Sequence, residues 1–306
     1  MIVVLRSIAL VGLVLVVAAC SGSAVSGSPS TSAPPSTTPS VTPSIIVSPT
    51  PAPVGAIDHA TGATDVVLRF EQGGGFVAPA FLASQAPIFT LYGDGTIIFR
   101  NPALEGPAPV GDIYRSGPFR IARLNEEQIQ GTLAMALGEG GLGAARPNYS
   151  NDRVADAPTA TFTVNAGGLR KTVSVYALGI DMDGLTDALP RAAFLKLAER
   201  LGNFDQNGTI ATAVYAPERY RGILLDGFGG APGAKPWPWK DIAPSDFVAP
   251  VDPNSFQLPA SVLTVAQVQA LGIDRYQGGM QGATLIGPDG KAYSFSLRPL
   301  LPDDAR

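Results

Sequence analysis

Alternating apolar and polar positions predict antiparallel strands in much of the chain after residue 57. Three pairs of β-rich runs are each joined by a short turn that contains glycine, which is typical of β-hairpins. In the second pair, apolar residues alternate with polar neighbours, the pattern of a strand with one buried face. The paired runs are 88–92 with 96–100, 160–165 with 169–176, and 283–286 with 292–297, and residues 65–72 and 221–226 are further strand candidates.

Three short segments instead repeat apolar residues every three or four positions, which indicates helices. They are residues 125–138, 187–202 and 264–272. Asn125 and Gln128 form the pattern of a capping box, and Asp187 and Thr264 are the expected N-caps of the other two helices. The sequence has no strand–helix–strand rhythm. The predicted fold class is therefore α+β, with antiparallel sheets built from hairpins and about three short helices packed on them.

The first twenty residues have the features of an export signal. Arg6 precedes an apolar run over residues 8–19, which is too short to cross a bilayer and is typical of a signal peptide. Residues 17–20, Val-Ala-Ala-Cys, resemble the bacterial lipobox, and this resemblance implies cleavage before Cys20 and lipidation of its thiol. The alternative is an ordinary signal peptide that ends in an unmodified cysteine. We expect the lipid anchor, on the extracytoplasmic face of the cell membrane.

Residues 21–54 have the composition of a disordered tether. Ser, Thr and Pro dominate this stretch, and no charged residue occurs between Arg6 and Asp58. Such a segment buries too little apolar surface to offset the entropy that is lost when it becomes ordered. We therefore divide the chain into a signal peptide (1–19), a lipidated cysteine with its tether (20–57), an α+β domain (58–205) and a second α+β subdomain packed on the first (206–306).

The charge and the rare residue types exclude several classes of function. The chain has 25 acidic and 21 basic residues, a formal charge of −4, and no basic block, which argues against a nucleic-acid partner. One Cys and one His exclude disulfide frameworks, Cys/His zinc sites and Cys–His nucleophiles within one chain. We expect no cofactor. His59 lies just after the tether, where we expect a solvated side chain and not a catalytic base.

One loop has oxygen-bearing side chains at the spacing of a calcium-binding loop. Asn203, Asp205 and Asn207 occupy its first, third and fifth positions, and Gly208 occupies the sixth. Val214 stands at the twelfth position, where such loops use a bidentate Glu, so the loop lacks two ligand oxygens. We expect an ordinary polar turn after a helix and keep the first three residues as calcium candidates.

Both tryptophans lie in the sequence Pro-Trp-Pro-Trp at residues 236–239. Proline favours an extended backbone, so alternation could send the two indoles to opposite sides. In that arrangement Trp237 or Trp239 forms a surface platform for a sugar ring or a peptide, with Tyr220 beside it. In the alternative arrangement both indoles cap the core near the junction of the two domains.

Five stretches of the sequence resemble stretches of other bacterial proteins. They are residues 89–98, 156–164 and 173–179, the Trp-Pro-Trp at 237–239 and the tail at 298–304. These stretches resemble uncharacterised lipoproteins of high-GC bacteria, and the resemblance spans most of residues 64–304. It implies a location in the cell envelope. Because those lipoproteins have no known activity, it assigns no functional residue.

The signal peptide, Cys20 and the tether favour the display of a folded module outside the cytoplasm, and no motif indicates a catalytic base. Our leading hypothesis is a non-enzymatic, membrane-anchored module that binds or scaffolds an envelope protein, a peptide or a glycan. The alternative is an envelope hydrolase, for example of glycans, which needs two carboxylates at catalytic separation in one cleft. A third hypothesis is a structural spacer without a ligand.

Overall fold

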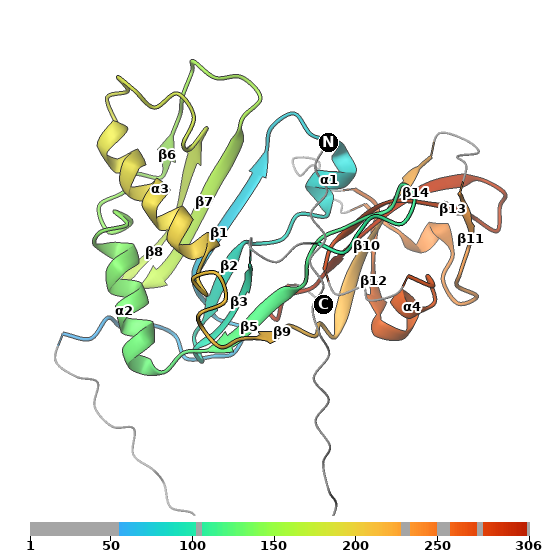
Figure 1. The fold of residues 1–306 in the computed structure, drawn as a ribbon, viewed down its shortest axis with the longest axis horizontal. Coiled ribbons are helices and arrows are strands. Elements are labelled where there is room, and N and C mark those ends of the chain that lie inside the picture. Colours follow the sequence, from blue (N-terminus) through green and yellow to red (C-terminus); the bar gives the residue numbers. More distant parts are fainter. Residues whose placement is uncertain (1–54, 102–105, 228–232, 250–257, 274–277, 305–306) are drawn as a thin grey trace, which may run out of the picture. The chain divides into compact units, whose positions relative to one another are not determined.

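The computed structural model describes residues 55–101, 106–227, 233–249, 258–273 and 278–304. The strands are β1 (Val66–Gly74), β2 (Phe89–Tyr92), β3 (Thr96–Arg100), β4 (Tyr114–Arg115), β5 (Phe119–Arg123), β6 (Asn148–Tyr149), β7 (Pro158–Ala166), β8 (Leu169–Tyr176), β9 (Ala213–Val214), β10 (Arg219–Asp226), β11 (Lys235–Pro236), β12 (Ala260–Thr264), β13 (Met280–Ile286) and β14 (Ala292–Pro299). The helices are α1 (Pro79–Ala83), α2 (Glu126–Leu137), α3 (Ala188–Gly202) and α4 (Val265–Gln269), with a 3₁₀ turn at Pro244–Asp246. Most strand pairs are antiparallel, so the predicted α+β class is confirmed (Figure 1).

The local signals in the sequence correspond to the elements that form. The three predicted hairpins are β2–β3, β7–β8 and β13–β14. The three predicted helices are α2, α3 and α4, and the capping boxes at Asn125 and Thr264 are both present. The prediction that the Asp187 side chain caps α3 is wrong, because it makes no capping hydrogen bond. Its carboxylate instead accepts hydrogen bonds from Arg191 at 2.8 Å and Arg146 at 2.7 Å, and charged donors compete well with a backbone N–H.

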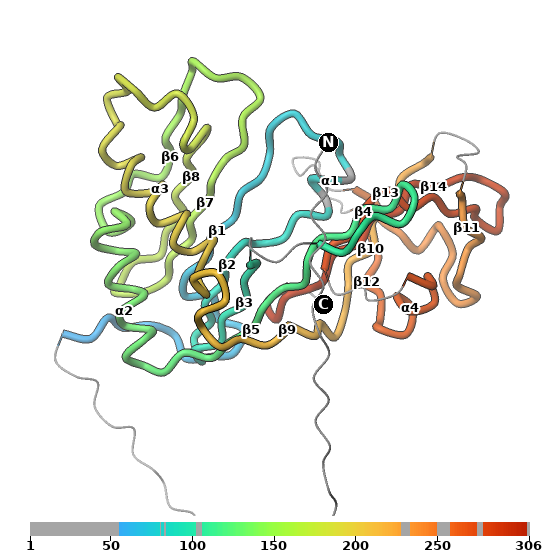
Figure 2. The backbone as a smooth tube through the Cα atoms, viewed as in Figure 1, coloured from blue at the N-terminus to red at the C-terminus, as the bar shows by residue number. Residues whose placement is uncertain are grey.

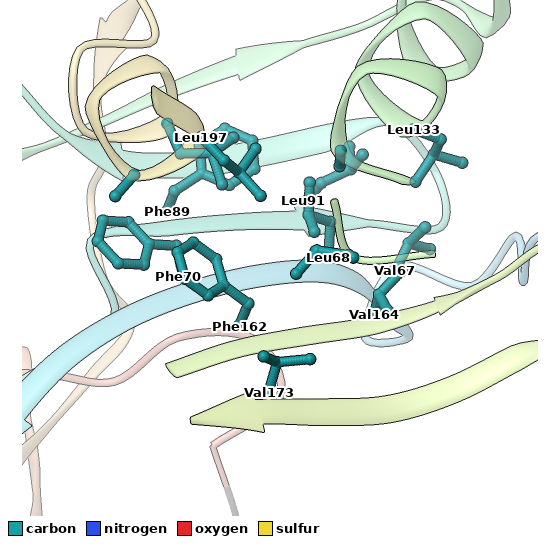
Figure 3. Packing of buried hydrophobic residues seen from close by; sticks show 14 of the residues in the cluster. Val67, Leu68, Phe70, Phe89, Leu91, Leu133, Phe162, Val164, Val173 and Leu197 are labelled. Carbon is teal, nitrogen blue, oxygen red and sulfur yellow. The ribbon is translucent and has the colours of Figure 1, made fainter. Parts of the chain in front are cut away.

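Eight strands of the described residues form the first sheet, in the order β6-β8-β7-β1-β2-β3-β5-β9. Helices α2 and α3 cover one face of this sheet (Figure 1). Leu133 of α2 and Leu197 of α3 point into the same buried cluster as the central strands (Figure 3). In that cluster the rings of Phe70 and Phe162 stack with centroids 4.9 Å apart. The predicted helix stripes and the alternating strand positions thus meet in one core.

The second sheet has the order β11-β13-β14-β10-β12, and β4 pairs with β13. Two short strands each pair with the sheet on the other side of the expected domain boundary. β4 precedes the expected boundary at residues 205–206 but belongs to the second sheet, and β9 follows the boundary but pairs with β5 of the first. Figure 2 traces the chain as it passes from β9 to β10. The residues that the structure describes fall in one compact unit, and the division into two domains stays a prediction.

The C-terminal tail ties the two sheets together. Leu301 is buried against the face of the first sheet opposite to α2 and α3. Asp303 accepts a hydrogen bond at 2.6 Å from Arg69 on β1, and Asp304 accepts two, at 2.8 and 2.9 Å, from Arg298 on β14. Burial acts to raise the pKa of Asp304, but the Arg298 guanidinium holds this pKa below its ordinary value. The tail therefore contributes a buried core side chain and two ion pairs.

Candidate functional site

A cavity of about 690 Å³ lies beside the C-terminal half of α3. Its walls come from α3, from β1, β3 and β7 of the first sheet, from the chain next to β2, β3 and β8, and from residues 116–118 between β4 and β5. The apolar side chains in the lining are those of Phe70, Ile88, Pro118, Ala160, Leu178, Leu195 and Ala198. The volume is in the range of about 300–1,000 Å³ that is usual for small-molecule sites.

Small residues on α3 create this space. Phe194, Leu197 and Leu201 form the stripe of the helix that packs into the core. Ala198 and Gly202, one turn apart, stand where the helix faces the cavity. A Cβ placed on Gly202 would meet only Ile88 within 4 Å, at 4.0 Å. The absence of large side chains at these two positions leaves the room beside the helix.

Polar side chains complete the lining, and they are Gln72, Arg100, Asn101, Ser116, Glu199 and Asn203. The Arg100 guanidinium lies over the Phe119 ring, 4.9 Å from its centroid. Asn101 donates a hydrogen bond from Nδ2 to the Oδ2 atom of Asp205, a residue that is only 1% exposed. With one basic and one acidic side chain, the described lining has no net formal charge.

Two smaller cavities adjoin this one. The first, of about 390 Å³, shares Arg100 and Ser116 with it, and the second, of about 400 Å³, shares Gln72. Glu71 lines the second cavity, and burial raises the pKa of its carboxyl group. Neither of these two cavities, nor the one beside α3, has more than one acidic side chain among its described lining residues.

The structure brings the predicted aromatic residues together in the core of the second sheet. Trp239 and Tyr220 are 6% and 5% exposed, and Trp237 packs against the same cluster. The two indoles meet edge to face with centroids 5.0 Å apart. Their N–H groups donate to the carbonyl oxygens of Ile242 at 2.7 Å and Gln267 at 2.8 Å. This is the arrangement in which both indoles cap a core, and it leaves Trp239 and Tyr220 no exposed face for a platform.

The three calcium candidates have partners within the chain or stand in a tight turn. The Asn203 side-chain oxygen accepts a hydrogen bond at 2.9 Å from the backbone N–H of Asn207. Asp205 points toward Asn101, and its backbone oxygen accepts hydrogen bonds from the turn that follows. The described part of the chain contains no cluster of three or more His, Cys, Asp or Glu side chains that could hold a metal ion.

The expectation of a solvated His59 is wrong. Its side chain is 5% exposed, Nε2 lies 3.2 Å from Glu126 and Nδ1 lies 2.7 Å from a backbone carbonyl oxygen. Its backbone forms a β-bridge with Ala166. Ile57, which we assigned to the tether, is likewise held by Gln130, whose side-chain oxygen accepts from the Ile57 N–H at 2.7 Å. Glu126, Ala166 and Gln130 are all distant in sequence from the residues they contact, so local composition could not indicate these contacts.

Cys20, the predicted lipidation site, lies outside the described residues, and its modification stays a prediction. None of the helices among the described residues is long and apolar enough to cross a membrane.

Sequence reasoning missed the cavity. The available signal was the pair of small residues Ala198 and Gly202, one turn apart on a helix with an otherwise large apolar stripe. Small residues indicate either close packing or a cavity, and only the facing strands decide between them.

Comparison with protein-family models, curated proteins and solved structures finds no match to this chain.

Proposed function

We propose that this chain is a non-catalytic binding protein, anchored through Cys20 on the extracytoplasmic face of the cell membrane, whose cavity beside α3 holds a small and largely apolar ligand. The cavity is the observation that supports this proposal. Phe70, Leu178 and Leu195 supply an apolar wall around about 690 Å³. An apolar ligand that enters such a space loses its contact with water and gains dispersion contacts, and both changes favour binding.

The polar part of the lining narrows the class of ligand. Arg100 and Glu199 carry opposite formal charges, which favours a ligand without a large net charge. The amides of Asn101 and Asn203 are side chains that both donate and accept hydrogen bonds. These groups support a ligand with an apolar body and a hydrogen-bonding end of little or no charge.

The hydrolase alternative gains no support from the described cavities. It needs two carboxylates about 5–10 Å apart in one cleft. Glu199, Glu71 and Asp65 each line a different cavity, and each is the one acidic side chain among the described lining residues of its cavity.

A cavity-filling substitution tests the proposed binding site. Gly202→Phe introduces a ring into the cavity at a position where a Cβ has room, and Gly131→Phe makes the same change on α2, where nothing lies within 4 Å of a Cβ. We expect wild type and G131F to bind the fluorescent fatty acid cis-parinaric acid saturably, and G202F to bind at least about tenfold more weakly. Equal affinity of G202F and wild type, or no saturable binding by wild type, would contradict the proposal.

Mass spectrometry of the mature chain tests the anchor. We expect an amino terminus at Cys20 that carries acyl chains, because at least two chains are needed for stable attachment. Cys20→Ala should leave the chain unprocessed and without lipid. An unmodified Cys20 in the wild type would exclude this anchor.

A further inference from the structure

The segment from the last two residues of β1 to the end of α1, residues 73–83, exposes apolar side chains to solvent. Phe76 is 90% exposed, Phe81 42% and Val77 39%. No charged residue occurs from Gln72 to Gly93. Phenylalanine is seldom this exposed without a role, and clustered apolar exposure indicates a surface that meets an apolar partner. We call residues 73–83 the apolar loop.

The apolar loop is held in place at its base. Gly74 and Gly75 both have positive φ, +81° and +83°, a conformation that turns the chain away from β1 and that glycine adopts without strain. The backbone N–H of Phe76 then donates to the carbonyl oxygen of Asp156 at 3.2 Å, and α1 lies against β10 and β14. The exposed rings therefore project from an anchored segment.

The apolar loop also adjoins the proposed binding site. Phe81 and Tyr114 line the cavity of about 390 Å³, which shares Arg100 and Ser116 with the cavity beside α3. Tyr114 is itself 68% exposed. The cavity that Phe81 lines therefore shares part of its wall with the cavity beside α3.

The size and the charge of the loop favour a lipid surface over a protein partner. An aromatic side chain buries at most about 150–250 Å², and Phe81 and Val77 expose less than half of their surface. Together with Phe76 they fall short of the roughly 500 Å² per partner that a stable protein interface needs. Binding at a membrane interface instead strengthens with the apolar area that is buried, so a few side chains of an already anchored protein add to it. Tyr114 and Arg115, across the smaller cavity from Phe81, are of residue types that favour the boundary between lipid and water.

We propose that the apolar loop contacts the membrane surface and that the ligand of the adjoining cavity is the acyl chain of a membrane lipid. The inference rests on the proposed binding function and names its ligand class and its source. Phe76 and Val77 enter the acyl region of one leaflet, and Phe81 lies at the mouth through which the chain reaches the cavity beside α3.

Quenching by brominated lipids tests the membrane contact. Phe76→Trp and Leu189→Trp place an indole at positions that are 90% and 87% exposed, the first on the apolar loop and the second on α3. Each mature variant is mixed with phosphatidylcholine–phosphatidylglycerol vesicles whose acyl chains are brominated, and the wild-type signal of the two native tryptophans is subtracted. Quenching of F76W alone supports the proposal. Quenching of neither variant, or of both equally, overturns it.

Transfer kinetics separate this inference from the binding function. Phe76→Ser should slow the transfer of cis-parinaric acid from vesicles to the protein about tenfold, while affinity for the same probe in solution stays unchanged. Leu189→Ser should change neither quantity. If the wild type does not bind cis-parinaric acid in solution, the proposed function itself is refuted. Intact solution binding with equal transfer rates for F76S and wild type would refute the membrane route alone.

Discussion

Replacement of Arg191 by methionine should destabilise the fold by about 3–5 kcal/mol. The Arg191 side chain on α3 is completely buried. It donates hydrogen bonds to Asp187 at 2.8 Å, to the Tyr176 carbonyl oxygen at 2.9 Å and to the Ser150 carbonyl oxygen at 2.5 Å. Methionine keeps much of the apolar stem but removes the guanidinium, so all three acceptors lose this donor.

The magnitude follows from burial. An unsatisfied buried acceptor costs about 1–3 kcal/mol, and removal of one partner from a buried ion pair costs about 3–5 kcal/mol. The total stability of a domain is typically about 5–15 kcal/mol, so this one change should remove a large fraction of it. Because Arg191 holds the first turn of α3, the loss also affects the helix that forms one wall of the cavity.

Urea unfolding followed by far-ultraviolet circular dichroism measures the effect. Lys196→Met is the matched control, since Lys196 is a basic residue on the exposed side of the same helix, and it should change the free energy of unfolding by less than about 0.5 kcal/mol. If R191M costs less than about 1 kcal/mol, or no more than K196M, the buried network does not stabilise the fold as argued.

Three further changes test other parts of the structure. Burial acts to raise the pKa of Asp187, but two neighbouring guanidinium groups lower this pKa below its ordinary value. The stabilisation by this carboxylate is therefore present above about pH 4 and is lost as the pH falls through the lowered pKa. The difference in unfolding free energy between wild type and D187N should shrink in acid, and a constant difference would contradict this. Gly95→Ala should cost about 2–4 kcal/mol, because Gly95 has φ +86° and a Cβ there would clash with the carbonyl oxygen of Leu124. Gly290→Ala, at φ +77° with open space around it, should cost about 1 kcal/mol, and equal losses in thermal unfolding would refute the clash. Trp239→Phe should cost about 1–3 kcal/mol in urea unfolding because the Gln267 carbonyl oxygen loses its donor, whereas no loss would show that the indole does not stabilise the core.

Local chemistry made much of the fold predictable. The turn at residues 93–95 fixes the β2–β3 hairpin through glycine and the Asp94 side chain, whose carboxylate accepts from Thr96. The capping boxes at Asn125 and Thr264 act within four residues and set the starts of α2 and α4. Such signals act over a few neighbouring residues, so the sequence alone indicates them.

Features that depend on distant residues were not predictable in this way. Asp187 stands at the N-cap position of α3, but its carboxylate pairs with the buried guanidinium of Arg191 instead of capping the helix. His59 is buried because Glu126 and Ala166 lie beside it, and neither is near it in sequence. The cavity depends on Ala198 facing two strands that lie earlier in the chain. In each case long-range packing, and not local propensity, decides the outcome.

The cavity as an acyl-chain site is the central claim, and nuclear magnetic resonance of the methyl-labelled protein with palmitic acid tests it most directly. The account predicts nuclear Overhauser contacts between the methylene protons of the ligand and the methyl groups of Ile88, Leu178 and Leu195, which line the cavity. Leu133 and Val173, in the closed core beneath the helices, should show none. The absence of contacts to the first three residues, or equal contacts to all five, would contradict the account.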